Sequence, residues 1–321
     1  MRVLFAGTPA VAVPSLEALL ASSHDVVGVL TRPPAPVGRK RVLTPSPVHS
    51  AAEAAGVQVI TSNRPHEEAT LTQLNTLAAD VVAVVAYGAL VRSPALELPR
   101  HGWINLHFSL LPAWRGAAPV QHAIMAGEEI TGATTFQIEA GLDTGPVLGT
   151  MTETIRARDT SGDLLDRLAH AGAPLLVSTL DALEAGAADP TPQSTQGVSL
   201  APRLTSADAQ VDWHLPGHVV DRRIRGCTPA PGAWTMLGGS RFKLGPVRPQ
   251  RDAQLSAEER TLAPGEICAS DGSVLVGTGT HPVLLDRVAP PGKGWMAATD
   301  WARGARLEHG AAFDGGAEVA R

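Results

Sequence analysis

The run ADVVAVVAYGAL at residues 79–90 decides the fold class of this chain. Its first half is almost continuously apolar and rich in valine, which is typical of a strand buried on both faces. A strand covered on both faces needs helices on each side of its sheet, as in α/β proteins. Residues 79–90 therefore predict a central strand of a parallel sheet.

Strand and helix patterns alternate on either side of this run. Short β-rich runs predict strands at residues 2–7, 26–31, 57–61, 102–108 and 131–140, and residues 143–155 are expected to begin with a turn and become a strand. Runs with apolar residues at helical spacing predict helices at residues 14–22, 46–55, 117–127 and 161–186. A loop is expected over residues 32–47. The alternation predicts a doubly wound, mostly parallel Rossmann-like sheet, whose ligands bind beyond the carboxyl ends of the strands.

The second part of the chain has a different pattern. A length of 321 residues suggests about two domains. Residues 188–210 are rich in Pro, Ser, Thr and Gln and predict a linker, so the first domain is expected at residues 1–187. After a predicted helix at residues 215–227, short strand candidates are broken by Gly and Pro. They predict a small OB-like β-barrel domain at residues 211–321.

Composition narrows the class of protein. Apolar residues make up 44% of the chain and charged residues 18%, which argues against disorder. The two cysteines, Cys227 and Cys268, form neither a disulfide framework nor a metal-ligand spacing, so reduced thiols in a cytoplasmic protein are expected. No apolar run reaches the roughly 18 residues that a membrane helix needs. The apolar start of the chain is better explained as a first strand than as a secretion signal.

The stretch NLHFSLLPAWRG at residues 105–116 contains the candidate chemistry. Asn105 and His107 share one face of a strand because side chains alternate along it. An amide donor beside an imidazole suits an oxygen that gains negative charge in acyl transfer. Asp143, in the glycine-flanked loop GLDTG, is placed to orient the imidazole. A buried Asn and a turn-forming Asp would explain the same spacing, and the spacing alone does not decide between them.

Several classes of site are argued against by missing motifs. The first strand ends in AGTPAVA without G-x-G-x-x-G, which argues against NAD. The chain has no G-x-x-x-x-G-K-[ST] loop for ATP and no G-x-S-x-G elbow for a hydrolase. Its eleven histidines show no cluster at ligand spacing, so no metal is expected.

Several motifs together resemble the methionyl-tRNA formyltransferase family over essentially the full chain. Folate-dependent formyltransferases share an Asn-x-His on one strand and an Asp on a later loop, and Asn105, His107 and Asp143 match them. The run SLLP at residues 109–112 with Gly116 is similar to their 10-formyltetrahydrofolate signature. These features also occur in relatives that act on glycinamide ribonucleotide, formyl-folate or sugar nucleotides. They therefore indicate the chemistry and leave the acceptor open.

Further segments resemble the tRNA-specific branch. They are FAGTP (5–9), GRKRVLTPSPV (38–48), VAYGALV (85–91), WRGAAPVQ (114–121), VDWHLPGHVVDRRIRG (211–226) and APGEI (263–267). The second of these is similar to a basic loop that this branch inserts after its second strand. The last two are similar to its C-terminal tRNA-contacting barrel, which many relatives lack.

The resemblance implies a function and a set of site residues. The formyl group would pass from 10-formyltetrahydrofolate to the α-amino group of methionine on initiator tRNA, giving N-formylmethionyl-tRNA for translation initiation. An Asn105 amide and a His107 N–H would stabilise the oxyanion, and Asp143 would orient His107. The folate would lie against Ser109, Leu110, Leu111, Pro112, Tyr87 and Gly88. The tRNA would contact Arg39, Lys40, Arg41, Arg222 and Arg225.

The chain departs from the family pattern at a few positions. Ala10 and Val11 replace an acidic and an aromatic residue, and Phe108 stands where a small residue is usual. The insertion loop has GRKR in place of GRGKK, and a Pro-Trp-Pro segment is replaced by residues 228–231. Phe108 would either narrow the pocket or point to the opposite face of the strand.

Other functions fit parts of the sequence. A sugar-nucleotide N-formyltransferase would share the chemistry, but the basic loop argues against it. A non-catalytic tRNA-binding protein would not need Asn105, His107 and Asp143 intact. A nucleotide-dependent oxidoreductase is disfavoured by the missing glycine fingerprint. Trp114 and Arg115 would either contact the acceptor or serve the fold, with Trp114 packing under the loop and Arg115 pairing with a carboxylate.

Overall fold

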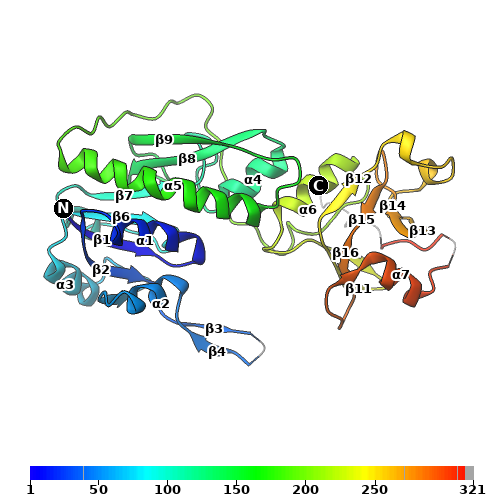
Figure 1. The fold of residues 1–321 in the computed structure, drawn as a ribbon, viewed down its shortest axis with the longest axis horizontal. Coiled ribbons are helices and arrows are strands. Elements are labelled where there is room, and N and C mark those ends of the chain that lie inside the picture. The colour runs from blue at the N-terminus through cyan, green and yellow to red at the C-terminus, as the bar shows by residue number, and fades with distance from the viewer. Residues whose placement is uncertain (39, 271, 309, 315–321) are drawn as a thin grey trace. The chain divides into compact units, whose positions relative to one another are not determined.

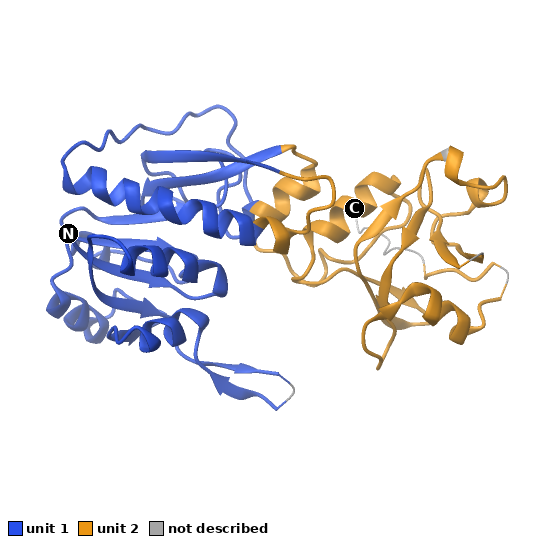
Figure 2. Ribbon diagram, viewed as in Figure 1, with its two compact units in different colours: residues 1–119, 130–154, 165–201 blue, residues 120–129, 155–164, 202–321 orange. Residues whose placement is uncertain are grey.

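A computed structural model describes residues 1–38, 40–270, 272–308 and 310–314 (Figure 1). The chain forms two compact units that interleave along the sequence (Figure 2). The first unit comprises residues 1–119, 130–154 and 165–201, and the second comprises residues 120–129, 155–164 and 202–321. The domain boundaries predicted at 187 and 211 stay a prediction.

A seven-stranded sheet forms the centre of the first unit. Its strands, in spatial order, are β5 (Val59–Thr61), β2 (Asp25–Thr31), β1 (Arg2–Gly7), β6 (Val81–Val85), β7 (Trp103–His107), β8 (Ile130–Gln137) and β9 (Val147–Thr154). The first five are parallel, whereas β8 and β9 pair antiparallel at one edge. This order of the parallel strands is that of a doubly wound sheet, with its switch point between β1 and β6. The predicted fold class is therefore confirmed.

Burial of β6 explains why its sequence decides the fold. All five residues of β6 are buried, and Val82 and Val84 belong to a core cluster with Leu4, Leu30 and Trp103. Each fully buried side chain of this size stabilises the fold by about 1.5–3 kcal/mol relative to exposure. The alternation of helices and strands places this apolar run between two covering layers.

Helices connect these strands or, for the last helix, follow strand β9. They are α1 (Val13–Leu20), α2 (Pro47–Ala54), α3 (Glu68–Leu77), α4 (Pro119–Ala126) and α5 (Ser161–Glu184). Ser46 caps α2 by accepting a hydrogen bond from the His49 N–H. Helix α3 was not predicted, because only Leu74 and Leu77 are buried on an otherwise polar sequence. The predicted loop 32–47 contains a short hairpin of β3 (Ala35–Val37) and β4 (Val42–Thr44).

The second unit contains two four-stranded antiparallel sheets. One sheet has the order β10 (Trp234–Leu237), β11 (Ser240–Leu244), β16 (Arg287–Ala289) and β17 (Met296–Ala297). The other has the order β12 (Val247–Pro249), β15 (Val283–Leu285), β14 (Ser273–Val276) and β13 (Ile267–Ser270). Helices α6 (Gly217–Gly226) and α7 (Ala298–Ala305) and a core that includes Trp213, Phe242, Trp301 and Phe313 complete the unit. The small OB-like β-barrel domain predicted after the α/β region is confirmed as a domain of antiparallel sheets.

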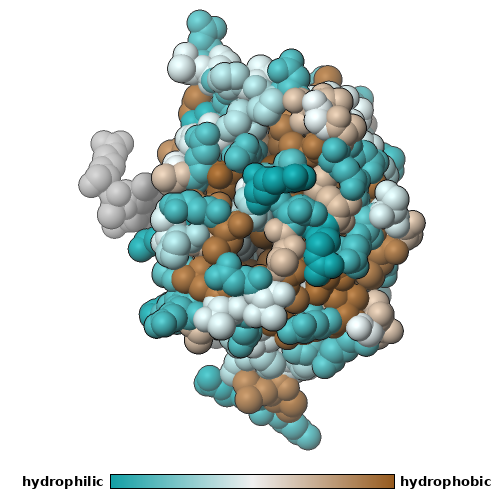
Figure 3. Space-filling model, turned by 90° about the vertical axis from the view of Figure 1, so that its left-hand side faces the viewer, coloured by the Kyte–Doolittle hydropathy of each residue, from teal (hydrophilic) through white to brown (hydrophobic). Residues whose placement is uncertain are grey.

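The surface at the amino ends of the parallel strands is mixed in character. Strand β1 begins on the side that lies on the left in Figure 1, and Figure 3 views the molecule from that side. Hydrophilic and hydrophobic side chains are interspersed on this face. Within the described ranges, no helix combines the length and the apolar character that a membrane crossing requires. The predicted catalytic residue His107 ends β7 on the opposite side of the sheet.

Candidate active site

Strand β7 brings Asn105 and His107 to the carboxyl end of the parallel sheet. Asn105 pairs with Phe136 of β8 and His107 with Thr134, so both residues lie in a regular ladder. Their two-residue spacing places both side chains on one face. His107 is 6% exposed, whereas Asn105 is half-buried. Among the described residues, no protein group is hydrogen-bonded to the Asn105 side chain, so its amide N–H groups are available to a ligand.

The turn after β7 is fastened to β8. Ser109 Oγ donates to the Ala113 carbonyl at 2.6 Å, and Thr134 Oγ1 donates to the Ser109 carbonyl at 2.7 Å. Thr134 Oγ1 also accepts from the Leu111 N–H at 3.2 Å. The Ser109 hydroxyl is therefore used inside the turn. Phe108, the unusual residue of this stretch, is buried at 6% exposure.

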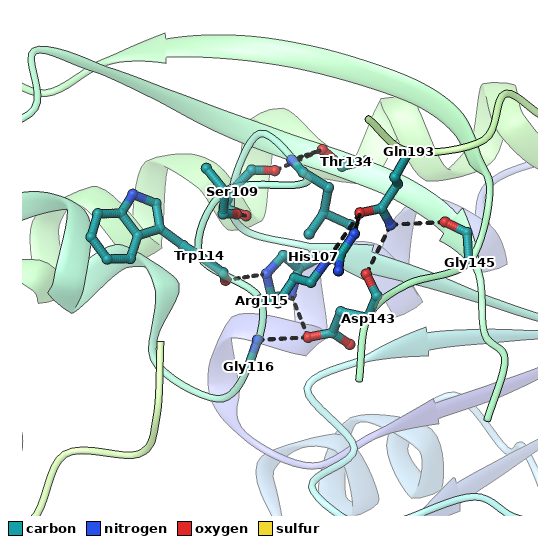
Figure 4. Close-up of polar contacts among 11 residues, drawn as sticks. His107, Ser109, Trp114, Arg115, Gly116, Thr134, Asp143, Gly145 and Gln193 are labelled. Atoms are coloured by element: carbon teal, nitrogen blue, oxygen red, sulfur yellow. Dashed lines mark hydrogen bonds and ion pairs between the residues drawn. The ribbon is translucent and has the colours of Figure 1, made fainter. Parts of the chain in front are cut away.

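Two groups engage the nitrogens of His107 (Figure 4). Nε2 lies 2.9 Å from the Trp114 carbonyl oxygen, which only accepts, so Nε2 carries a proton. Nδ1 lies 3.9 Å from Asp143 Oδ2. Burial lowers the pKa of His107, and the Asp143 carboxylate opposes part of that effect. The ring is therefore mainly neutral at pH 7, with the Nδ1 lone pair facing Asp143.

The loop that contains Asp143 is hydrogen-bonded to the residues that follow the turn after β7. Asp143 Oδ2 accepts a hydrogen bond from the Gly116 N–H at 2.7 Å. Gly116 has a φ of +124°, and a Cβ at this position would lie 2.7 Å from the Ala201 carbonyl oxygen. Only glycine allows this close approach of two backbone segments. The structure therefore brings the predicted His107 and Asp143 together through a glycine of the formyltransferase-like motif.

Gln193 also contacts this loop, although no feature of the sequence predicted that contact. Its Nε2 donates to the carbonyls of Asp143 and Gly145, both at 2.8 Å. Its Oε1 accepts from Arg115 Nε at 3.1 Å and Nη2 at 2.7 Å. Gln193 lies in the predicted linker, where no periodicity or motif distinguishes one polar residue from another. Arg115 thus serves the fold, but through an amide in place of the expected carboxylate.

The residues expected near the folate have different environments. Leu110, Leu111 and Pro112 are half-buried. Tyr87 is 2% exposed, and its hydroxyl donates to the Ser62 carbonyl at 2.7 Å, so its ring belongs to the core. Gly88 is exposed with a φ of +78°. The side chain of Tyr87 is therefore committed to packing, whereas Gly88 presents its backbone to solvent.

The predicted tRNA-contacting cations also differ. Lys40 and Arg41 are exposed at the turn of the β3–β4 hairpin, and Arg39 lies outside the described residues. Arg222 is half-buried on α6, with its guanidinium against Gly127.

Arg225 lies inside the second unit. It is 7% exposed, and its guanidinium donates to Asp221 Oδ2 at 2.8 Å and to the Asp159 carbonyl at 2.9 Å. This burial argues against the predicted tRNA contact of Arg225, because a phosphate would have to displace a buried ion pair.

Two family models match the chain. One, described as formyl transferase, matches residues 1–180, and the other, described as formyl transferase, C-terminal domain, matches residues 203–306. A methionyl-tRNA formyltransferase of Arthrobacter sp. (strain FB24) is 59% identical over 314 residues, covering 98% of this chain and 100% of that protein. One of Thermobifida fusca (strain YX) is 59% identical over 313 residues, covering 98% and 99%.

Solved structures share the fold at low identity. HypX from Aquifex aeolicus in complex with tetrahydrofolic acid has a TM-score of 0.66 and 17% identity, covering 94% of this chain and 47% of that one. A methionyl-tRNA formyltransferase from Clostridium thermocellum has a TM-score of 0.57 and 13% identity, covering 79% and 95%.

Proposed function

The chain belongs to the methionyl-tRNA formyltransferase family, and from that premise we propose that Asn105, His107 and Asp143 perform the formyl transfer. The enzyme transfers a formyl group to the amino group of methionine on tRNA. The observation that best supports the three residues is the approach of Asp143 to His107 beside an unoccupied amide, Asn105. His107 ends β7 at the carboxyl end of the doubly wound sheet, where such folds bind ligands, and Asp143 approaches it there.

The reaction begins with attack of the methionyl α-amine on the formyl carbon of 10-formyltetrahydrofolate. A C–N bond forms, and the carbonyl π electrons move onto oxygen. The Asn105 amide donates a hydrogen bond to this oxyanion. The nitrogen that attacked must lose a proton before the intermediate collapses. On collapse the C=O bond re-forms, the bond from carbon to N10 breaks, and N10 receives a proton.

His107 and Asp143 move these protons. The neutral ring offers the Nδ1 lone pair on the side of Asp143, and a proton taken there gives an imidazolium beside a carboxylate. A water carries the proton between the amine and this pair. The same proton is then returned to N10. Because Nε2–H is donated to the Trp114 carbonyl, the oxyanion depends mainly on Asn105, and His107 acts chiefly in proton transfer.

The contacts with the folate and the tRNA are assigned from where the residues lie. Residues 109–112 and the backbone of Gly88 border the folate, and Lys40 and Arg41 contact phosphates of the initiator tRNA. Exposed cations on a projecting hairpin suit a polyanion more than a small sugar nucleotide. Formylation of initiator tRNA places the enzyme in the cytoplasm, and neither a metal nor NAD takes part.

One assay tests the acceptor and the donor together. The purified protein is mixed with labelled 10-formyltetrahydrofolate and one of three acceptors: methionyl initiator tRNA, methionyl elongator tRNA, or an amino-sugar nucleotide. We expect label only on the initiator tRNA. Transfer to the sugar nucleotide, or no transfer to initiator tRNA, would contradict the proposed function.

A further inference from the structure

We propose that Gln193 is a positioning residue that holds the Asp143 loop in its reactive geometry through an amide clamp. The inference rests on the proposed function of the His107–Asp143 pair. It assigns a role to a residue of the segment that follows helix α5.

Every polar position of the Gln193 amide is used. One amide group can donate two hydrogen bonds and accept others. Here Nε2 donates to the carbonyls of Asp143 and Gly145, at 2.8 Å each, and Oε1 accepts two N–H groups of Arg115. A side chain saturated on both ends has one orientation of its amide, so it can fix the groups that it contacts.

The Asp143 loop needs such a support. Asp143 itself has a φ of +50°, in the left-handed region that L-residues other than glycine seldom adopt. Gly141, Leu142 and Thr144 are exposed, and Leu142 keeps 60% of its surface accessible. Apolar packing therefore contributes little to the loop, and its position depends on hydrogen bonds.

Both attachments of the loop lead back to one backbone segment. Arg115 binds Gln193, and the next residue, Gly116, donates to the Asp143 carboxylate. In the same segment, the Trp114 carbonyl accepts a hydrogen bond from the His107 Nε2–H. Residues 114–116 therefore set the distance between His107 and Asp143 from both sides.

That segment is itself held by the chain that follows Gln193. The Arg115 N–H donates to the Ser199 carbonyl at 2.9 Å, and the Ala201 N–H donates to the Arg115 carbonyl at 2.7 Å. Gln193 and its partner Arg115 are thus anchored by neighbouring residues of one connection. Gln193 touches Asp143 only at the backbone carbonyl, so it acts through Asp143 and not on the substrate.

The test compares Gln193→Ala and Gln193→Glu with the matched control Gln196→Ala, an exposed glutamine of the same segment. Glutamate keeps an acceptor for Arg115 but loses both donations to the loop. A displacement of about 1 Å can cost on the order of 10²-fold in rate, so we expect both Gln193 variants to lose about 10- to 100-fold in kcat. The KM for tRNA should change less than about twofold, and Gln196→Ala should match the wild type.

A second measurement separates positioning from general loss of structure. NMR titration of His107 should give a lower pKa in Gln193→Ala, because the Asp143 carboxylate that raises it is no longer held in place. An unchanged kcat in folded Gln193→Glu would overturn the inference, even where Gln193→Ala fails to fold. Asp143→Asn serves as the reference. An inactive Asp143→Asn beside an unaffected Gln193→Glu refutes the clamp alone, whereas an active Asp143→Asn refutes the proposed function.

Discussion

The protonation of His107 results from two opposing effects within a few ångströms. Burial favours the neutral imidazole, and the Asp143 carboxylate at 3.9 Å favours the charged form. Burial prevails, so in the proposed reaction the ring starts neutral and can take a proton. The backbone fixes both partners of the imidazole ring. The Trp114 carbonyl oxygen accepts a hydrogen bond from the ring, and the Gly116 N–H holds the Asp143 carboxylate beside it. The proposed catalytic role of His107 therefore depends on backbone atoms, which no side-chain pattern in the sequence reveals.

This balance predicts how His107 titrates. Its pKa in the folded protein should lie below the unperturbed value of about 6.5. Asp143→Asn should lower it further, because the carboxylate is the charge that raises it. Below pH 6.5 the unfolded chain binds a proton that the native ring resists, so His107 should reduce stability as the pH falls through that range. NMR titration of the ring checks the direction, and a pKa that rises in Asp143→Asn would be inconsistent with the structure.

Among the described residues, no protein group is hydrogen-bonded to the Asn105 amide, so a substitution there removes no protein hydrogen bond. Asn105→Ala should therefore leave the unfolding free energy nearly unchanged while turnover falls by about 10²–10³-fold, as when one oxyanion donor is removed. Asn75→Ala, at an exposed position of α3, is the matched control and should keep wild-type turnover. Steady-state kinetics with thermal unfolding of each variant measures both quantities. A parallel loss of stability and rate in Asn105→Ala would indicate a structural role.

Elements were predictable from the sequence where apolar residues are continuous or recur with a regular spacing. The valine-rich run 79–90 contains the observed strand β6, although β6 ends at Val85, and the strand 102–108 and the helix 161–186 were predicted near the observed bounds of β7 and α5. Helix α3 was missed because its apolar face is narrow. The contact of Gln193 with the Asp143 loop was missed for another reason. It joins residues about 50 apart through an amide, and composition marked that segment as a linker.

The loop after β8 is constrained because its backbone lies against the end of that strand. A Cβ on Gly145 would lie 1.7 Å from the Gln137 carbonyl oxygen, so Gly145→Ala must displace the loop or the end of β8. We expect a loss of about 1–3 kcal/mol in unfolding free energy, together with slower turnover. Gly294→Ala, where a Cβ meets nothing within 4 Å, should be neutral in chemical denaturation. Equal stability of the two variants would show that the loop accommodates a side chain.

At the scale of the whole molecule, the chain carries a net charge of −5 yet must bind a polyanion. Local cations therefore decide where tRNA binds. Burial removes Arg225 from the set expected from the sequence, whereas Lys40 and Arg41 stay exposed on the β3–β4 hairpin. The four-residue spacing of Asp221 and Arg225 can be read from the sequence, but spacing alone does not show that the pair is buried.

Neutralising the hairpin should change the salt dependence of tRNA binding. Each lost phosphate contact lowers the slope of log K against log salt by about 0.7–0.9. Lys40→Gln combined with Arg41→Gln should therefore weaken binding and reduce the slope by roughly one to two. Arg64→Gln combined with Arg100→Gln removes the same charge at other exposed positions and should have little effect. Equal slopes for the two double variants would exclude the hairpin from the tRNA interface.

We propose that Asn105, His107 and Asp143 together transfer a formyl group to methionyl initiator tRNA. Single-turnover formylation with excess enzyme measures this step directly, because it separates chemistry from product release. We predict rapid transfer by the wild type, and rates at least about 10²-fold lower in Asn105→Ala and Asp143→Asn with tRNA binding retained. Wild-type rates in either variant would contradict the account.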